Sequence, residues 1–321
     1  AAMKYFLLGS VASAIFLYGI ALLYAGTGSL TYIGLFEFFS GDVLVFSDGL
    51  LSAGVALLFV GLLFKIAAAP FHAWAPDVYQ GAPAGIVGYM GAVAKIGAMA
   101  ALLRFVQVPF QSVVESIQIP LAGVAAFSVV LGTLYAIVQQ DLRRVLAYSG
   151  VSHAGFLLMG VAIGGVAEVQ VLFYLSTYVL VLVGAFGIVS LLEGSGSAGS
   201  PIENWKGLGR RSPFLAWALT IFMLAMAGMP ATAGFIGKFG IFTRVWAEDL
   251  EWLVIVGLLA SVAAFFFYLR VVVAMFFEEG EGKSPRVGWP VGVGLGLTIL
   301  ITVGLGLYPT PLLDVLTSAL G

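Results

Sequence analysis

The chain has 321 residues, of which 61% are hydrophobic and 9% are charged, whereas soluble domains carry about 25% charged residues. A soluble fold cannot bury so much apolar surface, so the composition indicates a protein that crosses a membrane several times. The net charge of −2 implies no basic surface for nucleic acid. The absence of cysteine excludes thiolate metal sites, iron–sulfur clusters and disulfides from this chain.

Nine apolar segments are long enough to cross a bilayer, because about 20 apolar residues span its hydrocarbon core. In chain order they cover residues 3–25, 49–80, 84–106, 119–139, 144–164, 169–192, 213–246, 252–277 and 287–308. The fold class predicted from this spacing is all-α, a polytopic membrane helix bundle of about nine transmembrane segments.

Two of these segments, 49–80 and 213–246, are too long for one straight crossing, and each contains proline and a lysine, Lys65 or Lys238. Paired interrupted segments of this kind are typical of the discontinuous helices of transporters. We therefore expect breaks near residues 65–70 and 228–230, with both lysines pointing into the bundle. The alternatives are a kinked core helix in either segment and, for Lys65, a side chain that snorkels to the interface.

Two further titratable residues lie inside single segments. Lys95 is about eleven residues, or ~16 Å, from either end of its segment, which is too far for a lysine stem to reach the interface easily. His153 lies among Tyr148, Ser149 and Ser152, so a packing role and a proton path are both open for it. Burial disfavours the charged form of a lysine, so a buried lysine can release a proton when its surroundings change.

Basic residues gather in three of the loops. They lie between the fourth and fifth, sixth and seventh, and eighth and ninth segments: Arg143, Arg144, Lys206, Arg210, Arg211, Lys283 and Arg286. Alternating crossings put all three loops on one side, which the excess of positive charge assigns to the cytoplasm. The C-terminus is then expected outside. The sequence shows no phosphate loop, nucleophile elbow or metal-ligand motif, so we expect no self-contained enzyme site.

Four blocks of the sequence resemble a known family. FKIAAAPFHAWAPDVYQGAP, AKIGA, DLRRVLAYSGVSHAGFLLMG and GMPATAGFIGKF follow one another in the order and spacing of the antiporter-like membrane subunits of respiratory complex I. The resemblance covers nearly the whole chain. The DVYQGAP turn and a lysine at position 95 are most similar to the N-type subunit, the counterpart of mitochondrial subunit 2.

The resemblance implies about fourteen helices, two inverted five-helix repeats and proton translocation. Roughly five helices are then expected to precede Ala1, so the first repeat is incomplete. Residues 1–106 match the last three helices of the first repeat, 119–277 the second repeat and 287–321 a C-terminal helix. The resemblance gives a proton-translocating role to five residues: Lys65, Lys95, Lys238, His153 and Lys4.

The resemblance also implies partners and a location. The NADH, FMN, iron–sulfur clusters and quinone of such a complex are expected in partner subunits, with no cofactor in this chain. Its neighbours are expected to be other membrane subunits, antiporter-like ones among them, and lipids, in a bacterial inner membrane. Two alternatives remain: a subunit of a multi-subunit sodium/proton antiporter or membrane-bound hydrogenase, and a passive scaffold.

Overall fold

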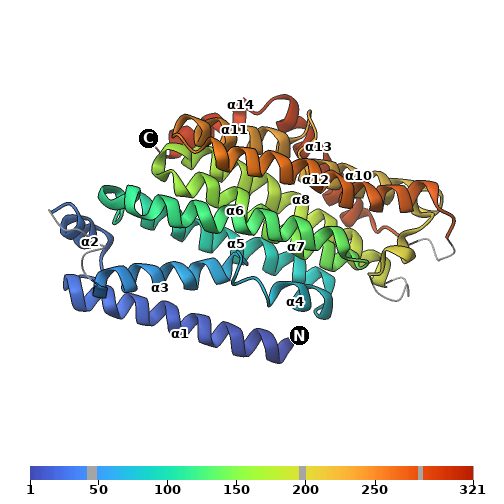
Figure 1. Cartoon of the computed structure of the whole chain (residues 1–321). Coiled ribbons are helices and arrows are strands. Elements are labelled where there is room, and N and C mark those ends of the chain that lie inside the picture. Colours follow the sequence, from blue (N-terminus) through green and yellow to red (C-terminus); the bar gives the residue numbers. More distant parts are fainter. Residues whose placement is uncertain (42–48, 195–199, 281–284, 321) are drawn as a thin grey trace.

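A computed structural model describes residues 1–41, 49–194, 200–280 and 285–320. Over these residues the chain is a bundle of long, roughly aligned helices (Figure 1). Seven elongated helical stretches are long and apolar enough to cross a membrane. They comprise α1 (Ala2–Thr27), α5 (Ala84–Gln107), α6 (Val114–Val138), α7 (Leu142–Ala162), α8 (Glu168–Gly194), α12 (Glu251–Phe277) and α13 (Trp289–Leu307).

The two overlong segments are broken, as predicted. The first consists of α3 (Gly49–Lys65) and α4 (Ala75–Gly81), and the second of α10 (Pro213–Ala227) and α11 (Ala233–Ala247). Each break contains an alanine in the left-handed region, Ala67 with φ 59° and Ala231 with φ 68°, a conformation that costs an L-residue energy. All nine predicted segments therefore match helices or broken helices of the described chain.

Several short elements connect these helices. They are α2 (Tyr32–Phe39), α9 (Leu208–Arg211), α14 (Thr310–Leu320) and the 3₁₀ turns η1 (Gln111–Val113), η2 (Gly164–Ala167) and η3 (Ile202–Trp205). The sequence predicts one helix in residues 287–321, but the structure has two, because the chain leaves helical geometry at Tyr308 before Pro309. No residue of α14 is buried.

Helix α7 is the centre of the bundle, and nearly all of its residues are buried. It packs closely on α6 because glycines remove side chains from the contact. A Cβ at Gly132 would lie 2.5 Å from the backbone nitrogen of Ser152, and one at Gly155 would lie 2.7 Å from the carbonyl oxygen of Ala125. Small residues permit such close approach between membrane helices.

The basic loops meet at one end of the bundle, as predicted. Leu142 donates its backbone N–H to the Ser200 carbonyl at 2.7 Å, which joins the first loop to the second. Lys206 pairs with Glu278 at 3.0 Å, which joins the second loop to the third, and the carboxylate raises the pKa of Lys206. Lys283 lies outside the described residues. The C-terminus lies near the opposite end (Figure 1).

Candidate functional site

A layer of polar side chains separates two apolar cores along the bundle. One core lies near the basic end and the other lies beyond it. The helices α5, α7, α8 and α12 each contribute buried apolar residues to both cores. On α7 the change falls between Ala147 and Ala154, and on α5 between Val87 and Ala98. We call the side chains at this level the buried polar layer: Lys95, His153, Tyr174, Tyr178, Lys238 and Tyr268.

The broken helix α10–α11 positions Lys238. Gly228 ends α10 with φ 91°. The backbone N–H groups of Gly228 and Met229 donate to the carbonyl oxygens of Leu224 and Ala225. The Lys238 ammonium donates to the carbonyl oxygens of Met226 and Ala227, each at 3.0 Å. The carbonyl end of a helix carries partial negative charge, so the end of α10 stabilises this cation without a carboxylate.

Lys95 is held in a similar way on an unbroken helix. Its ammonium donates to the Gly150 carbonyl at 2.7 Å and lies 5.0 Å from the centroid of the Tyr178 ring. The Lys95 and Lys238 side chains are 3% and 4% exposed. Neither forms a salt bridge with a carboxylate of the described residues, so each proton is held by neutral groups alone.

His153 stands between the two lysines at the centre of a hydrogen-bonded chain. Its Nδ1 bonds to the Tyr174 hydroxyl at 2.6 Å and its Nε2 to the Tyr268 hydroxyl at 3.2 Å. The Tyr268 hydroxyl also shares a hydrogen bond with Ser149. A neutral imidazole donates from one nitrogen and accepts at the other. A proton that enters at one nitrogen can therefore leave from the other.

A small cavity borders His153. Its volume is about 10 Å³, and it is lined by His153, Tyr174, Thr177, Tyr178, Val181, Ala225, Met226 and Gly234. A space of about 10–15 Å³ is the smallest that holds one water molecule. Met226 is also a carbonyl partner of Lys238, so the cavity extends from the ring beside Lys95 to the residue that binds Lys238.

Lys65 lies next to the change between the two cores on α3, which falls between Leu63 and Phe64. The prediction that its side chain points into the bundle is wrong. It is the last residue of α3, and its side chain is exposed. The carbonyls at this helix end already have partners: Leu62 and Leu63 accept from Ile66 and Ala68, and Phe64 accepts from the Trp74 indole at 3.0 Å. Lys238 differs because it follows its break and reaches back to free carbonyls.

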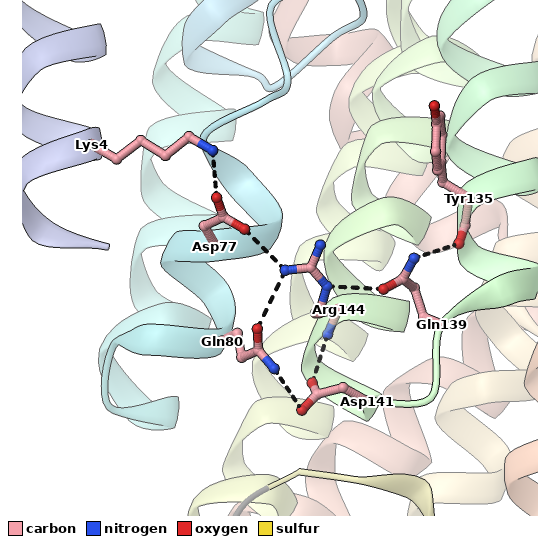
Figure 2. Close-up of polar contacts among 7 residues, drawn as sticks. All are labelled: Lys4, Asp77, Gln80, Tyr135, Gln139, Asp141 and Arg144. Atoms are coloured by element: carbon pink, nitrogen blue, oxygen red, sulfur yellow. Dashed lines mark hydrogen bonds and ion pairs between the residues drawn. The ribbon is translucent and has the colours of Figure 1, made fainter.

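Lys4 lies near the basic end, away from the buried polar layer, in a network of charged groups (Figure 2). It pairs with Asp77, and Asp77 pairs with Arg144 at 2.9 Å. Arg144 also bonds to Gln80 and Gln139, at 3.3 Å and 2.9 Å. The structure therefore brings Lys95, His153 and Lys238 together and places Lys65 and Lys4 elsewhere.

Sequence reasoning missed the three tyrosines of the buried polar layer. It expected Tyr148, Ser149 and Ser152 to surround His153, because they are neighbours on one helix. Ser152 instead contacts Thr133 at 3.2 Å, and the Tyr148 ring lies against Tyr135. The spacing of Tyr174 and Tyr178 by four residues on one apolar segment was the available signal. Among the described residues no group of histidines and carboxylates is arranged to hold a metal ion.

Comparison with known proteins identifies close relatives. Residues 1–264 match the family described as NADH:quinone oxidoreductase/Mrp antiporter, transmembrane. The chain is 45% identical over 328 aligned positions to NADH-quinone oxidoreductase subunit N of Mycobacterium bovis, covering 99% of this chain and 61% of that protein. It is 42% identical to subunit N 3 of Streptomyces griseus, over 60% of that protein. The chain thus spans about three fifths of the length of these relatives.

Solved structures share the fold. A chain of respiratory complex I from Thermus thermophilus superposes with a TM-score of 0.82 at 36% identity, over 98% of this chain and 68% of that one. A chain of an archaeal membrane-bound sulfane sulfur reductase gives 0.85 at 28% identity, over 99% and 64%. A chain of the Mrp complex of a Dietzia species gives 0.88 at 20% identity, over 98% and 66%, a likeness of fold alone.

Proposed function

The chain belongs to the NADH:quinone oxidoreductase/Mrp antiporter transmembrane family, and we propose that it carries protons across a membrane as the N-type subunit of a proton-pumping NADH:quinone oxidoreductase. The observation that carries the proposal is the buried polar layer. Two lysines that pair with no carboxylate of the described residues lie near a histidine that is hydrogen-bonded at both ring nitrogens.

The chemistry of the layer suits a proton that must move. A buried carboxylate would hold an ammonium strongly, because the attraction between opposite charges grows in a low dielectric. Carbonyl oxygens stabilise the ammonium less, so Lys95 and Lys238 can lose their protons when a charge nearby changes. His153 then accepts at one nitrogen and releases from the other.

The wider assembly follows from the same proposal. NADH, FMN, iron–sulfur clusters and quinone belong to partner subunits, and this chain contributes no redox site. Other membrane subunits, including antiporter-like ones, and lipids adjoin it in a bacterial inner membrane, with its C-terminus outside. Residues 1–106 belong to an incomplete first repeat, 119–277 to the second repeat, and 287–321 to the C-terminal region. Lys65 and Lys4 serve the proton path of the first repeat.

The alternatives have less support. Relatives named subunit N are 40–45% identical to this chain, whereas the Mrp chain is 20% identical, which favours the oxidoreductase over a sodium/proton antiporter. A passive scaffold has no use for two lysines at mid-membrane, because a charged residue at the bilayer centre costs at least ~2.5 kcal/mol.

The test replaces Lys238 with methionine, which fills the same space but cannot titrate, in the intact complex reconstituted into vesicles. We expect normal assembly, with proton uptake and coupled quinone reduction both lowered. The control is Lys206→Met, because Lys206 lies in the basic loop region and pairs with Glu278. Equal proton uptake in the two variants, normalised to assembled complex, would contradict the proposal.

A further inference from the structure

Tyr178 has a buried hydroxyl that has no hydrogen-bond partner among the described residues. Leaving such a group unsatisfied costs about 1–3 kcal/mol, so its position calls for an explanation. The Tyr178 ring lies against the His153 ring, with centroids 4.3 Å apart and the planes tilted by 31°, and the Lys95 ammonium lies 5.0 Å from the centroid of the same ring. Tyr178 is therefore the side chain that contacts both Lys95 and His153.

The hydroxyl faces Gly150 in the middle of α7. A Cβ at this position would lie 3.2 Å from the Tyr178 hydroxyl and 3.6 Å from the Lys95 ammonium, and no other atom would lie within 4 Å. Both polar groups thus converge on the same face of Gly150 without a hydrogen bond between them. The Lys95 ammonium donates one of its three N–H groups to the Gly150 carbonyl, which leaves two to donate elsewhere.

Gly150 also differs from the packing glycines of α7. A Cβ at Gly155 would run into the α6 backbone at 2.7 Å, which explains that glycine. No backbone atom blocks Gly150, and alanine in its place would favour the helix by roughly 0.5–1 kcal/mol. A methyl group here would instead press on the Tyr178 hydroxyl at 3.2 Å and lie beside the Lys95 ammonium.

We propose that a water molecule on this face of Gly150 joins the Lys95 ammonium to the Tyr178 hydroxyl, and that Tyr178 relays the proton of Lys95 toward His153. The inference rests on the proposed function, because it names the group through which the proton leaves the Lys95 ammonium. Gly150 keeps the water site open. Tyr178 also lines the cavity that His153, Tyr174 and Met226 share. Its side chain therefore adjoins both Lys95 and the cavity beside His153.

The proton balance of the relay is simple. The ammonium of Lys95 gives one proton to the water and becomes a neutral amine. The water passes a proton to the Tyr178 oxygen as Tyr178 gives its own hydroxyl proton to a second water, in the cavity that Tyr174 and His153 also line. That water protonates the Tyr174 oxygen as Tyr174 gives its hydroxyl proton to Nδ1 of His153, which becomes the imidazolium. One proton moves, and both waters and both tyrosines end as they began. The reverse sequence reloads Lys95.

Two variants of the intact complex test the relay. Tyr178→Phe keeps the ring against His153 and removes only the hydroxyl, and Gly150→Ala fills the water site. Because a positioned proton-transfer group contributes about 10²–10⁴-fold and water offers a partial bypass, we expect proton uptake to fall by about tenfold in each. The matched controls are Tyr89→Phe, an exposed residue, and Gly187→Ala on α8, where a Cβ would meet nothing within 4 Å.

A second readout is independent of activity. In a high-resolution cryo-electron microscopy map of the wild-type complex, we expect density for one water within hydrogen-bonding distance of both the Lys95 and the Tyr178 groups, and its loss in Gly150→Ala. Direct contact of the two groups without this water would overturn the inference. So would wild-type proton uptake in either variant, or an equal loss in the controls.

Lys95→Met separates this inference from the proposed function. If Lys95→Met abolishes proton uptake while Tyr178→Phe and Gly150→Ala retain it, only the relay through Tyr178 is wrong. If Lys95→Met itself pumps like the wild type, the proposed role of Lys95 has failed and the relay fails with it.

Discussion

The Lys238 ammonium illustrates how the buried polar layer holds a charge loosely. Besides its two carbonyl partners it lies 3.5 Å from the Ser261 hydroxyl of α12 and 4.5 Å from the centroid of the Phe156 ring. All of these neighbours are neutral, and each attracts a cation less strongly than a carboxylate does. The proton on Lys238 is therefore retained by dipoles that would not prevent its release.

Adding a carboxylate at this site should trap the proton. In Ser261→Asp the new carboxylate would lie within reach of the Lys238 ammonium, and an opposite charge within about 4–6 Å stabilises the charged form by 1–3 pKa units. We expect proton uptake, normalised to assembled complex, to fall at least about tenfold, since each unit is ~1.36 kcal/mol.

The control is Ser261→Asn, which has the same shape as the aspartate and no charge. It should retain most of the proton uptake measured in reconstituted vesicles. Similar losses in the aspartate and asparagine variants would show that size, rather than charge, disturbs the site, and the account of a loosely held proton on Lys238 would lose its support.

Tyr268 provides a second test of a single side chain. Tyr268→Phe removes the partner of His153 Nε2 and of Ser149, so the chain of hydrogen bonds through the imidazole ends at the ring. We expect slower proton uptake with normal assembly, while Tyr89→Phe stays like the wild type. Unchanged proton uptake in Tyr268→Phe would demote His153 to a packing residue.

The sequence identifies the titratable residues of the site better than their partners. Lys95, His153 and Lys238 are conspicuous because charged or polar groups interrupt apolar segments. Tyr174 and Tyr268 are 21 and 115 positions from His153, and only the packing of α8 and α12 on α7 brings them to it. Lys65 and Lys238 look equivalent in sequence, but they differ because one precedes its break and the other follows it.

At the scale of elements, the contact between α6 and α7 sets the position of His153. Gly132→Ala would place a methyl group 2.5 Å from the Ser152 nitrogen, so the helices must separate, and such overpacking costs about 1–3 kcal/mol. We expect a lower thermal unfolding temperature for the assembled protein. Gly123→Ala on the same helix is the control, because a Cβ there meets nothing within 4 Å. A shift in Gly123→Ala as large as that in Gly132→Ala would contradict this packing.

The order and breaks of the helices follow from sequence because hydrophobic length and proline act locally. Both interrupted segments are found where Pro70 and Pro230 predict them, and their boundaries agree within a few residues. The short helices α2 and α14 were not predicted, since eight and eleven residues are too few to show as spanning segments. The direction of each side chain depends on packing between helices, which hydropathy does not report.

At the scale of the whole molecule, ion pairs tie the basic end together with unequal strength. Arg143 pairs with Glu193, and it also donates to the carbonyls of Gln80 and Ala82 at the end of α4. The Arg143 and Glu193 side chains are 8% and 23% exposed, so this pair is largely buried, whereas those of Lys4 and Asp77 are 45% and 38% exposed. Exposed pairs contribute about 0–1 kcal/mol, while removing one partner of a buried pair costs about 3–5 kcal/mol.

Glu193→Gln should therefore lower the thermal stability of the chain far more than Asp77→Asn. Raising the ionic strength should weaken the contribution of the exposed pair and leave the buried pair nearly unchanged, because salt screens exposed charges most. Thermal unfolding of both variants at low and high salt measures this directly. Equal destabilisation by the two substitutions would contradict the assignment of Arg143 as the main tie between α4, α7 and α8.

Lys95→Met in the intact, reconstituted complex tests the central claim most directly, with proton uptake and NADH oxidation normalised to assembled complex. Methionine fills the space of Lys95 but cannot titrate, and arginine remains charged throughout because its guanidinium is not deprotonated in proteins. We predict that both substitutions leave assembly largely normal and lower proton uptake together with quinone reduction. Wild-type proton uptake in Lys95→Met would show that the buried charge takes no part in proton transfer.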